Sequence, residues 1–474
     1  MNSRVNTDHK DPSGPAGTAD DKTTHLRGAL RTRQMVMIAI GGVIGAGLFV
    51  GSGKAISQAG PAVLVAYAAV GTLVVLVMRM LGEMSVAQPE TGSFSSYAGR
   101  ELGPWAGLAV GWLYAYHWCV VIGFEAVAAG VIARQFLPGL PPWLAALIVM
   151  ASLMAVNFCR VESYGSFEFW FAMIKVAAIT VFLLIGLAAI LGALPGHSAP
   201  GLANLTGQGG FAPNGWLPVL QASLIVFFSY FGTEAITIAA GEATQPAEAV
   251  RAGIRSVIWR ILLFYIGAIT VVVTLMPWNT TAVTESPFTA VLDHLGVPGA
   301  SSIMNAVLLT AILSCLNSGL YSSSRMFYSL AHRGEAPRLL CRTAPNGAPV
   351  PAIVLASAVG LITVVANYFL PTGVIFDFLL SSSGSIAVII YLAITVTHLR
   401  ARARMQRECP DRLTVRMWWY PYLDLVVLAA LLTIIGAMAL NTATSRSLIL
   451  TLFVTAIAVL CGVVHTARRA PKSG

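Results

Sequence analysis

The chain has 474 residues, of which 56% are hydrophobic and only 10% are charged. Its mean hydropathy is +0.75, and soluble globular domains carry about 25% charged residues. The composition therefore excludes a soluble enzyme and predicts an integral membrane protein. The net charge of +9 would suit nucleic acid, but the placement of the basic residues described below argues against that partner.

Residues 1–33 are polar, rich in Asp, Thr, Gly and Pro, and lack an apolar core. They predict a disordered cytoplasmic tail and not a cleaved signal peptide. A membrane-spanning helix needs about 20 mostly apolar residues. Twelve such stretches follow, at 34–54, 60–82, 104–133, 142–159, 168–194, 215–240, 256–277, 301–330, 349–370, 374–398, 418–440 and 447–467.

Basic residues gather on one side of these stretches. With the N-terminus inside, all Lys and Arg residues lie in the tails, on even-to-odd connections or at adjoining helix ends, except Lys54, Arg134, Lys175 and Arg446. The positive-inside rule then places both termini in the cytoplasm.

Motifs for chemistry are lacking. The six cysteines have no CxxC or Cys/His spacing, so they predict neither disulfides nor a metal site. The sequence holds no GxSxG, HExxH or Walker loop either. We expect no cofactor and no enzymatic activity.

The first apolar stretch contains GGVIGAGLFVGSG, Gly41 to Gly53. Glycine costs about 1 kcal/mol per residue inside a helix. In a bilayer, irregular backbone is tolerated only where it lines a cavity or is buried in protein. The glycines thus predict an unwound segment at a binding site, and the alternative is close helix packing through small-xxx-small motifs.

A second interruption lies in the sixth stretch, where polar residues and Gly232 separate apolar sequence between Phe228 and Glu234. Spans one and six are five apart, as two five-helix inverted repeats require. This spacing favours a secondary transporter with two broken helices. A channel is disfavoured because such breaks suit an occluded site better than a pore.

Several segments resemble a known family. They are GGVIGAGLFVGSG, VMRMLGEM, VIGFEAVAA, FEFWFAMIKV, TEAITIAAGEATQP and SCLNSGLYSSSRMFYSLAHRGEAP. From about Leu26 onward the chain resembles bacterial amino acid permeases of the amino acid/polyamine/organocation superfamily, most of all those for 4-aminobutyrate (GABA). Permeases for aromatic amino acids, lysine, proline, and D-alanine with glycine share much of this framework.

The resemblance implies an all-α integral membrane protein of the leucine-transporter type. It has twelve transmembrane helices and five-plus-five inverted repeats, with spans one and six unwound. We expect a transport core at 34–400, with repeats at about 34–195 and 214–400, then spans eleven and twelve with a basic loop at 401–467, and a cytoplasmic tail at 468–474.

The resemblance also implies a substrate site at the two breaks. Backbone amides at Gly45, Ala46 and Gly47 are expected to bind the substrate carboxylate, since glycine lets a ligand approach the backbone. Carbonyls of Val43, Phe228 and Phe231 are expected to accept the substrate ammonium.

Aromatic residues near the sixth-span break usually gate this fold, which indicates Phe228, Tyr230 and Phe231. Ordinary core or lipid packing is the alternative. Glu234 is expected to bridge the two breaks without touching substrate.

Two further charges lie inside spans. Lys175 is expected to carry the coupled proton, because related proton-coupled permeases place a lysine there; the alternative is snorkelling to an interface. Glu125 is expected to recognise the substrate amine or share proton traffic, and the alternative is a protonated carboxyl bonded between helices.

Other polar residues carry weaker expectations. Ser314 and Asn317 face the cavity or serve as polar contacts between helices, and Asp377 and Asp424 are expected at solvated span ends. The cytoplasmic segments 83–97 and 242–255 are expected to form gate contacts with arginines such as Arg79, Arg251 and Arg255.

The expected function is proton-coupled import of GABA or a related ω-amino acid across the bacterial cytoplasmic membrane by alternating access. The alternatives are a proton symporter of neutral or aromatic α-amino acids, an exchanger, and a nutrient receptor without transport. The expected partners are a small amino acid and membrane lipid, with no nucleic acid, and the protein is expected to be a monomer or a weak homo-oligomer.

Overall fold

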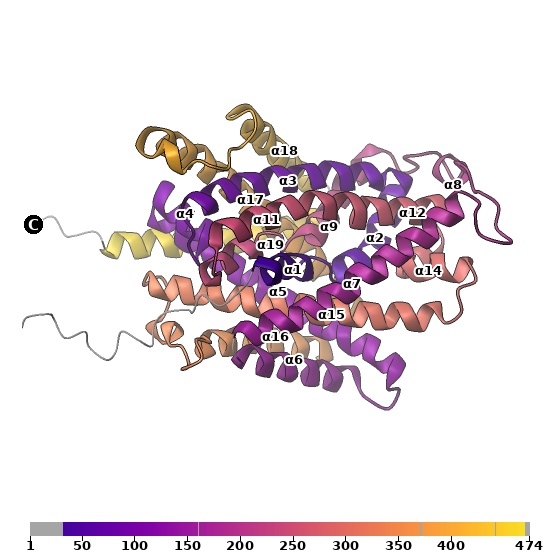
Figure 1. Ribbon diagram of the computed structural model, residues 1–474, viewed down its shortest axis with the longest axis horizontal. Helices are drawn as coiled ribbons and strands as arrows, with labels where there is room; N and C mark the ends of the chain where they lie inside the picture. Colours follow the sequence, from indigo (N-terminus) through magenta and orange to yellow (C-terminus); the bar gives the residue numbers. More distant parts are fainter. Residues whose placement is uncertain (1–31, 160, 370–371, 441, 470–474) are drawn as a thin grey trace, which may run out of the picture.

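The computed structural model describes residues 32–159, 161–369, 372–440 and 442–469. Nearly all of the predicted tail therefore lies outside the described residues. Within them the chain is helical and forms no β-strand (Figure 1). The α-helices are α1 Thr32–Gly41, α2 Ser52–Ala59, α3 Val63–Ala87, α4 Ser93–Glu101, α5 Pro104–Phe136, α6 Pro142–Phe158, α7 Val161–Ile190, α8 Ala203–Thr206, α9 Trp216–Tyr230, α10 Ala235–Ala239, α11 Pro246–Arg260, α12 Ala268–Leu275, α13 Thr281–Glu285, α14 Pro287–His294, α15 Ala300–His332, α16 Val350–Phe369, α17 Thr372–Glu408, α18 Tyr422–Ala439 and α19 Thr442–Arg469.

Proline begins four of these helices, at Pro104, Pro142, Pro246 and Pro287. The N–H groups in the first turn of a helix have no acceptor within the helix, so the N–H that proline lacks is not missed there, and the ring fixes a helical φ. Local sequence thus sets where α5, α6, α11 and α14 start.

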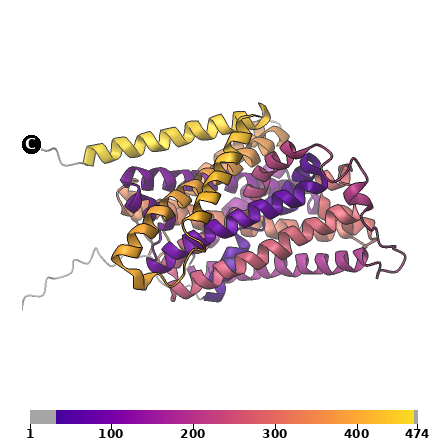
Figure 2. The ribbon, with the colours of Figure 1, turned by 90° about the horizontal axis from the view of Figure 1, so that it is seen from above.

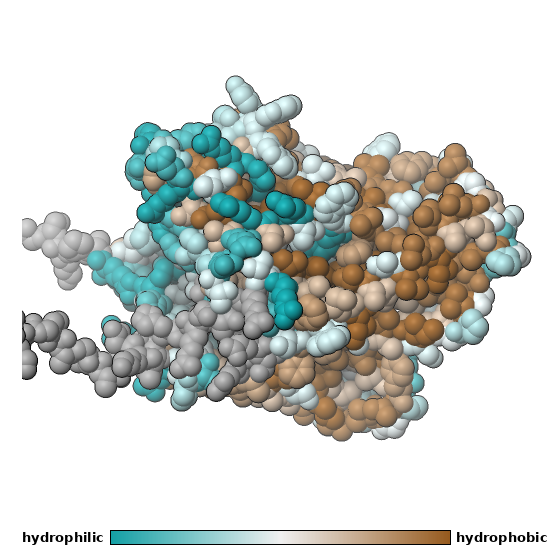
Figure 3. Space-filling view, in the orientation of Figure 1, coloured by the Kyte–Doolittle hydropathy of each residue, from teal (hydrophilic) through white to brown (hydrophobic). Residues whose placement is uncertain are grey.

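Nine segments of the described chain are long and apolar enough to cross a membrane, and shorter apolar helices lie at Pro142–Phe158 and Val350–Ala366. On the face of the molecule seen in Figure 3, apolar residues cover most of the area toward one end and hydrophilic residues gather mainly at the other end. The protein is thus a multi-pass membrane protein.

Both predicted interruptions are present. The first stretch divides into α1, an irregular segment at 42–45, a π-helical turn at Gly47–Gly51, and α2. The sixth divides at 231–234 into α9 and α10. The two broken helices contact each other, since α2 packs on α9 and α1 on α10.

The bundle surrounds these breaks. The long helices α5 and α15 pack along each other, α7 lies against α1, and α17 lies against α9. Helix α19 runs along the outside of the bundle (Figure 2). The broken helices therefore lie in the interior, where Trp216–Ala239 is buried over its whole apolar window.

The hydrophilic end contains buried ion pairs that differ from the expected gate contacts. Glu83 pairs with Arg402 at 2.6 Å, and Glu242 pairs with Arg325 at 2.8 Å. Arg79, Arg251 and Arg255 form no ion pair with any residue that the structure describes. The ion pairs of the two predicted segments thus use Arg402 and Arg325 and not the arginines named from the sequence, because the paired residues are far apart in the chain.

The prediction of a solvated Asp424 is wrong. Its side chain is fully buried, and its Oδ1 lies 2.5 Å from His398 Nδ1. Position near a span end suggested exposure, but α17 packs over this end of α18 and buries the carboxylate against its histidine. The side chain of Asp377 lies outside the described residues.

Candidate functional site

Lys175 of α7 lies at the first break. Its Nζ donates hydrogen bonds to the carbonyl oxygens of Gly41 at 2.6 Å and Ile44 at 2.9 Å, and its side chain is fully buried. Both carbonyls lie where the helix unwinds, so they lack the usual i+4 amide partner. Lys175 therefore satisfies the opened backbone and does not reach an interface.

Tyr265 joins the two breaks. Its hydroxyl lies 2.8 Å from the carbonyl oxygen of Ser229 in α9 and 3.1 Å from that of Val43. The Ser229 hydroxyl lies 2.8 Å from the carbonyl oxygen of Gly47 and also bonds within its own helix. The unwound segments are thus held against each other by side-chain hydroxyls.

Gly232 makes their close approach possible. Its φ is +107°, and a Cβ placed there would lie 2.4 Å from the carbonyl oxygen of Gly42. An L side chain would meet both a disfavoured backbone conformation and a clash. Glycine is required at this crossing.

Glu234 organises the sixth-span break itself. Both of its carboxylate oxygens accept a hydrogen bond from the amide of Gly232, at 3.0 and 3.1 Å. Tyr391 of α17 lies 3.5 Å from Oε2. The carboxylate therefore supports the unwound backbone and does not line the central cavity described next.

A small cavity lies between the breaks. Its free volume is about 10 Å³, roughly the space of one water molecule. A substrate cannot enter it without movement of its walls. It is lined by Val43, Gly45, Gly47, His117, Trp118, Val121, Glu125, Phe228, Phe231 and Cys315.

Glu125 of α5 occupies the site proposed for a carboxylate. Its Oε1 lies 3.4 Å from the amide nitrogen of Ala46, and its Oε2 has no hydrogen-bond partner among the described residues. The side chain is 1% exposed. One of the three amides predicted to bind the substrate carboxylate thus faces a carboxylate of the chain itself.

The predicted carbonyl acceptors are partly engaged. Val43 accepts from Tyr265, as described, and the carbonyl of Phe228 lies 3.3 Å from the amide of Phe231. Each of these carbonyls retains a second lone pair that a substrate donor could use.

The aromatic candidates separate into two groups. Phe228 and Phe231 line the cavity, with ring centroids 5.7 Å from Phe124 and 4.2 Å from His117, respectively. Tyr230 does not line it, and its hydroxyl donates to the carbonyl oxygen of Tyr67 in α3 at 3.2 Å. The structure thus brings the two phenylalanines, and not Tyr230, to the cavity.

The sequence reasoning missed Glu168, a fully buried carboxylate of α7. Ser314 donates to its Oε1, and Asn317 Nδ2 lies 3.2 Å from its Oε2. Asn157 in turn donates to Asn317 at 2.8 Å. Ser314 and Asn317 therefore connect helices around an acid. The signal was available, because Glu168 precedes Lys175 by seven residues and so lies on the same helix face.

His117 and Trp118 were also missed, although a histidine inside an apolar span points to a polar environment. Among the described residues no three His, Cys, Asp or Glu side chains gather as a metal site requires. The chemistry around the two breaks is that of backbone amides and carbonyls, the three carboxylates of Glu125, Glu168 and Glu234, and the amine of Lys175.

A solved structure shares the fold. It is a nucleobase-cation-symport-1 family transporter in a closed conformation with bromovinylhydantoin bound. The TM-score is 0.56 at 17% sequence identity, over 95% of this chain and 96% of that chain. The likeness concerns the fold alone.

The sequence comparisons extend over nearly the whole chain. A gamma-aminobutyric acid permease of Bacillus subtilis is 48% identical over 444 residues, covering 94% of each chain. The gamma-aminobutyric acid permease of Escherichia coli is 44% identical over 444 residues, covering 94% of this chain and 95% of its own. An aromatic amino acid transport protein of Corynebacterium glutamicum is 41% identical, covering 88% and 90%.

The family model described as "Amino acid permease" matches residues 34–473, which include both breaks and the cavity between them. The expected resemblance is thereby confirmed. The chain belongs to the amino acid permease family.

Proposed function

We propose that this permease imports GABA or a related ω-amino acid together with protons across the bacterial cytoplasmic membrane by alternating access. The observation that carries the proposal is the cavity between two broken helices, where Glu125 faces the Ala46 amide. The names of the relatives from Bacillus subtilis and Escherichia coli support GABA as the substrate.

In this proposal the substrate carboxylate binds the amides of Gly45, Ala46 and Gly47, which displaces Glu125 from Ala46. The displaced carboxylate then pairs with the substrate ammonium. GABA separates its two charges by three methylene groups, so its amine needs a counter-charge away from the carboxylate site. An α-amino acid carries its ammonium next to the carboxylate, where the carbonyls of Val43, Phe228 and Phe231 would suffice.

We assign proton coupling to Lys175. Its ammonium group binds two carbonyls of the span-one break, so its presence favours one arrangement of that backbone. A neutral amine has one donor fewer and binds the carbonyls less strongly. Loading or losing a proton at Lys175 would therefore shift the break between two conformations.

We assign Phe228 and Phe231 to the gate over the substrate, and Glu234 to the support of the sixth-span break. Tyr230 acts from outside the cavity, through its hydrogen bond to the carbonyl oxygen of Tyr67. Closure of the small cavity around a larger ligand would require the two phenylalanine rings to move.

We further propose twelve spans with inverted repeats at 34–195 and 214–400 and both termini in the cytoplasm. The first apolar segment, Gly47–Ala87, has 41 residues, which is long enough for part of span one and all of span two. With α1 completing span one, this segment accounts for two spans, and the two shorter apolar helices bring the nine segments to the proposed twelve spans. Spans eleven and twelve correspond to α18 and α19, beyond the repeats.

The test is uptake of radiolabelled GABA into proteoliposomes that hold the purified permease. An inward proton gradient is imposed, the vesicles hold no substrate, and unlabelled amino acids compete. The proposal expects gradient-driven accumulation that GABA blocks and that alanine, lysine and phenylalanine do not.

Other outcomes point elsewhere. Uptake only into vesicles preloaded with amino acid would mean an exchanger. Strong uptake of phenylalanine without GABA uptake would overturn the substrate and favour an activity like that named for the relative from Corynebacterium glutamicum. A lack of transport for every amino acid tried would favour a receptor.

A further inference from the structure

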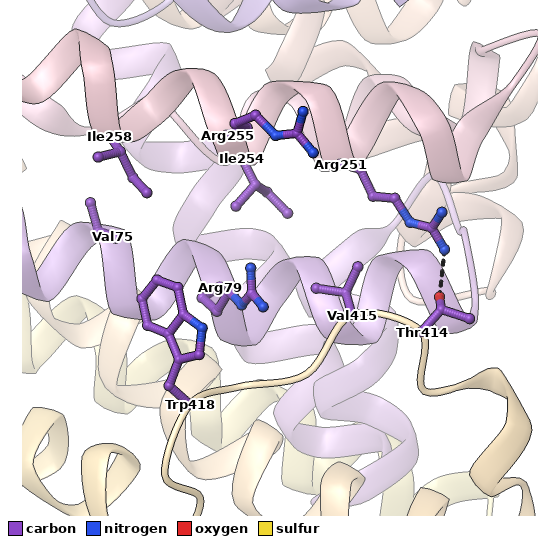
Figure 4. A pocket seen from close by; sticks show the side chains of 9 residues that line it. All are labelled: Val75, Arg79, Arg251, Ile254, Arg255, Ile258, Thr414, Val415 and Trp418. Atoms are coloured by element: carbon purple, nitrogen blue, oxygen red, sulfur yellow. Dashed lines mark hydrogen bonds between the residues drawn. The ribbon is translucent and has the colours of Figure 1, made fainter.

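A second and much larger cavity lies at the hydrophilic end of the bundle, away from the central site. It has a volume of about 540 Å³ and opens between α3, α11 and the segment that precedes α18 (Figure 4). None of the residues that line it lines the central cavity. It is therefore a separate pocket.

Three arginines line this pocket: Arg79 of α3, and Arg251 and Arg255 of α11. None forms an ion pair with any described carboxylate. Arg79 Nε donates to the carbonyl oxygen of Arg416 at 2.9 Å, and Arg251 donates to the Thr414 hydroxyl at 2.6 Å. The pocket thus concentrates three positive charges, and none of its lining residues is acidic; Glu83 lies within electrostatic range of Arg79 but already pairs with Arg402.

Other arginines at this end of the molecule behave differently. Arg402 pairs with Glu83, Arg404 pairs with Glu101, and Arg325 pairs with Glu242. These three arginines are each held by a carboxylate of the chain. The three arginines of the pocket lie together in a hollow that no carboxylate lines, which leaves room for an external anion between them.

The walls between the arginines are apolar. Val75, Ile254 and Ile258 face the space from the two helices (Figure 4). The indole of Trp418 lies against Arg79, with the guanidinium carbon 4.7 Å from the ring centroid. A free ion in water gains nothing from such walls, whereas an amphiphilic anion gains from both the charges and the apolar surface.

Exposed aromatic side chains indicate the level of the membrane at which the pocket lies. Trp259, Trp418, Trp419 and Tyr422 are 63%, 44%, 80% and 72% exposed. Tryptophan and tyrosine gather at the membrane–water interface, at the level of the lipid headgroups. In the π-helical segment Ile261–Gly267 that continues α11, exposed Leu262 and Leu263 extend the surface beyond Trp259, so an apolar face for acyl chains adjoins the pocket.

We propose that this pocket binds the phosphate headgroup of an anionic phospholipid, with its acyl chains along the exposed face formed by the end of α11 and the π-helical segment Ile261–Gly267. Guanidinium groups form bidentate, charge-assisted hydrogen bonds to phosphate, and basic pockets between transmembrane helices suit such headgroups. The bound phosphate supplies the charge that no described carboxylate provides. The lipid would then bridge α3, α11 and the segment before α18.

The test uses detergent-purified, delipidated permease and native mass spectrometry. The probes are palmitoyl-oleoyl phosphatidylglycerol, phosphatidylcholine with the same chains, and inorganic phosphate. The proposal expects one tightly bound phosphatidylglycerol per chain. It expects the triple variant Arg79→Gln/Arg251→Gln/Arg255→Gln to bind this lipid about 100-fold more weakly.

The matched control is Arg338→Gln/Arg342→Gln/Arg407→Gln. These arginines are exposed at the same end and lie outside the pocket. Their replacement removes the same amount of positive charge as the pocket variant does. Wild-type affinity for phosphatidylglycerol in this control supports the proposal. Equal losses in both triple variants would overturn it, because the attraction would then come from overall charge.

Two measurements on the wild-type protein decide the matter even if the pocket variant does not fold. Phosphatidylcholine that binds as tightly as phosphatidylglycerol would overturn the proposal, since the headgroup charge would not matter. Inorganic phosphate that displaces the lipid at equal concentration would also overturn it, because a free anion would then be the ligand.

Discussion

The Nζ atom of Lys175 lies 2.6 Å from the carbonyl oxygen of Gly41, the last residue of α1. A charged side chain thus completes the hydrogen bonding of a helix that ends inside the membrane. In the proposed mechanism this contact is also a proton-dependent switch, because the strength of the hydrogen bond depends on the charge of the amine.

Replacing Lys175 tests this switch. Lys175→Met should abolish accumulation driven by a proton gradient while substrate exchange across the membrane persists, since methionine keeps the volume and cannot carry a proton. The measurement is GABA uptake at several external pH values, with Lys175→Arg as the variant that keeps the charge. Normal accumulation with unchanged pH dependence in Lys175→Met would contradict the assignment.

Glu125→Gln tests the proposed counter-charge. Its amide is isosteric but neutral, so the apparent KM for GABA should rise at least about ten-fold, the effect of losing a charge-assisted hydrogen bond of about 1.5 kcal/mol or more. Competition assays at several pH values measure it. An unaltered apparent affinity throughout would assign Glu125 to a hydrogen bond between helices instead.

Gly232→Ala should stop transport. The added Cβ would lie 2.4 Å from the Gly42 carbonyl oxygen at a φ of +107°, so the two breaks could not keep their contact. The control is Gly436→Ala in α18, where a Cβ meets no atom within 4 Å. Uptake rates normalised to protein in the membrane compare the two, and equal rates would mean that the crossing at Gly232 does not matter.

Tyr265→Phe should loosen the contact between the breaks. It removes the hydroxyl that bonds the carbonyl oxygens of Ser229 and Val43. This loss should lower the free energy of unfolding of the purified protein by about 1–3 kcal/mol and slow uptake. Tyr67→Phe is the control, because Tyr67 is equally buried and its hydroxyl bonds no backbone carbonyl of either break. Similar losses in both variants would show that the bridge contributes nothing.

Glu168→Gln should lower uptake, and its effect should depend on Lys175. Both side chains are buried on one face of α7, where the carboxylate of Glu168 and the ammonium group of Lys175 attract each other. A double-mutant cycle with Lys175→Met measures the coupling. The double variant should lose less activity than the two single effects combined, and strictly additive losses would separate the two residues.

Sequence alone predicted the helix breaks because glycine and polar residues inside an apolar span have few explanations in a bilayer. It also pointed to six of the ten residues that line the cavity: Val43, Gly45, Gly47, Glu125, Phe228 and Phe231. Trp118, Val121 and Cys315 were not found, since an apolar or weakly polar residue in a packed helix carries no sign of the direction it faces; His117 was missed although its place in an apolar span was a signal.

The ion pairs between distant helices could not be predicted from the sequence, for a different reason. Glu83 binds Arg402 and Glu242 binds Arg325, and no periodicity relates residues on separate helices. Asp424 shows the same difficulty, because its burial depends on how α17 covers α18. Glu168 could have been found, since its spacing from Lys175 is fixed by the helix that carries both.

The central cavity of about 10 Å³ has a thermodynamic consequence for any binding measurement. If the conformation that admits substrate is a minor member of the ensemble, the apparent dissociation constant exceeds the intrinsic one by the inverse of its population. A variant that loosens the closed arrangement, such as Tyr265→Phe, could then bind substrate more tightly while transporting it more slowly. Affinity and turnover would move in opposite directions for the same change.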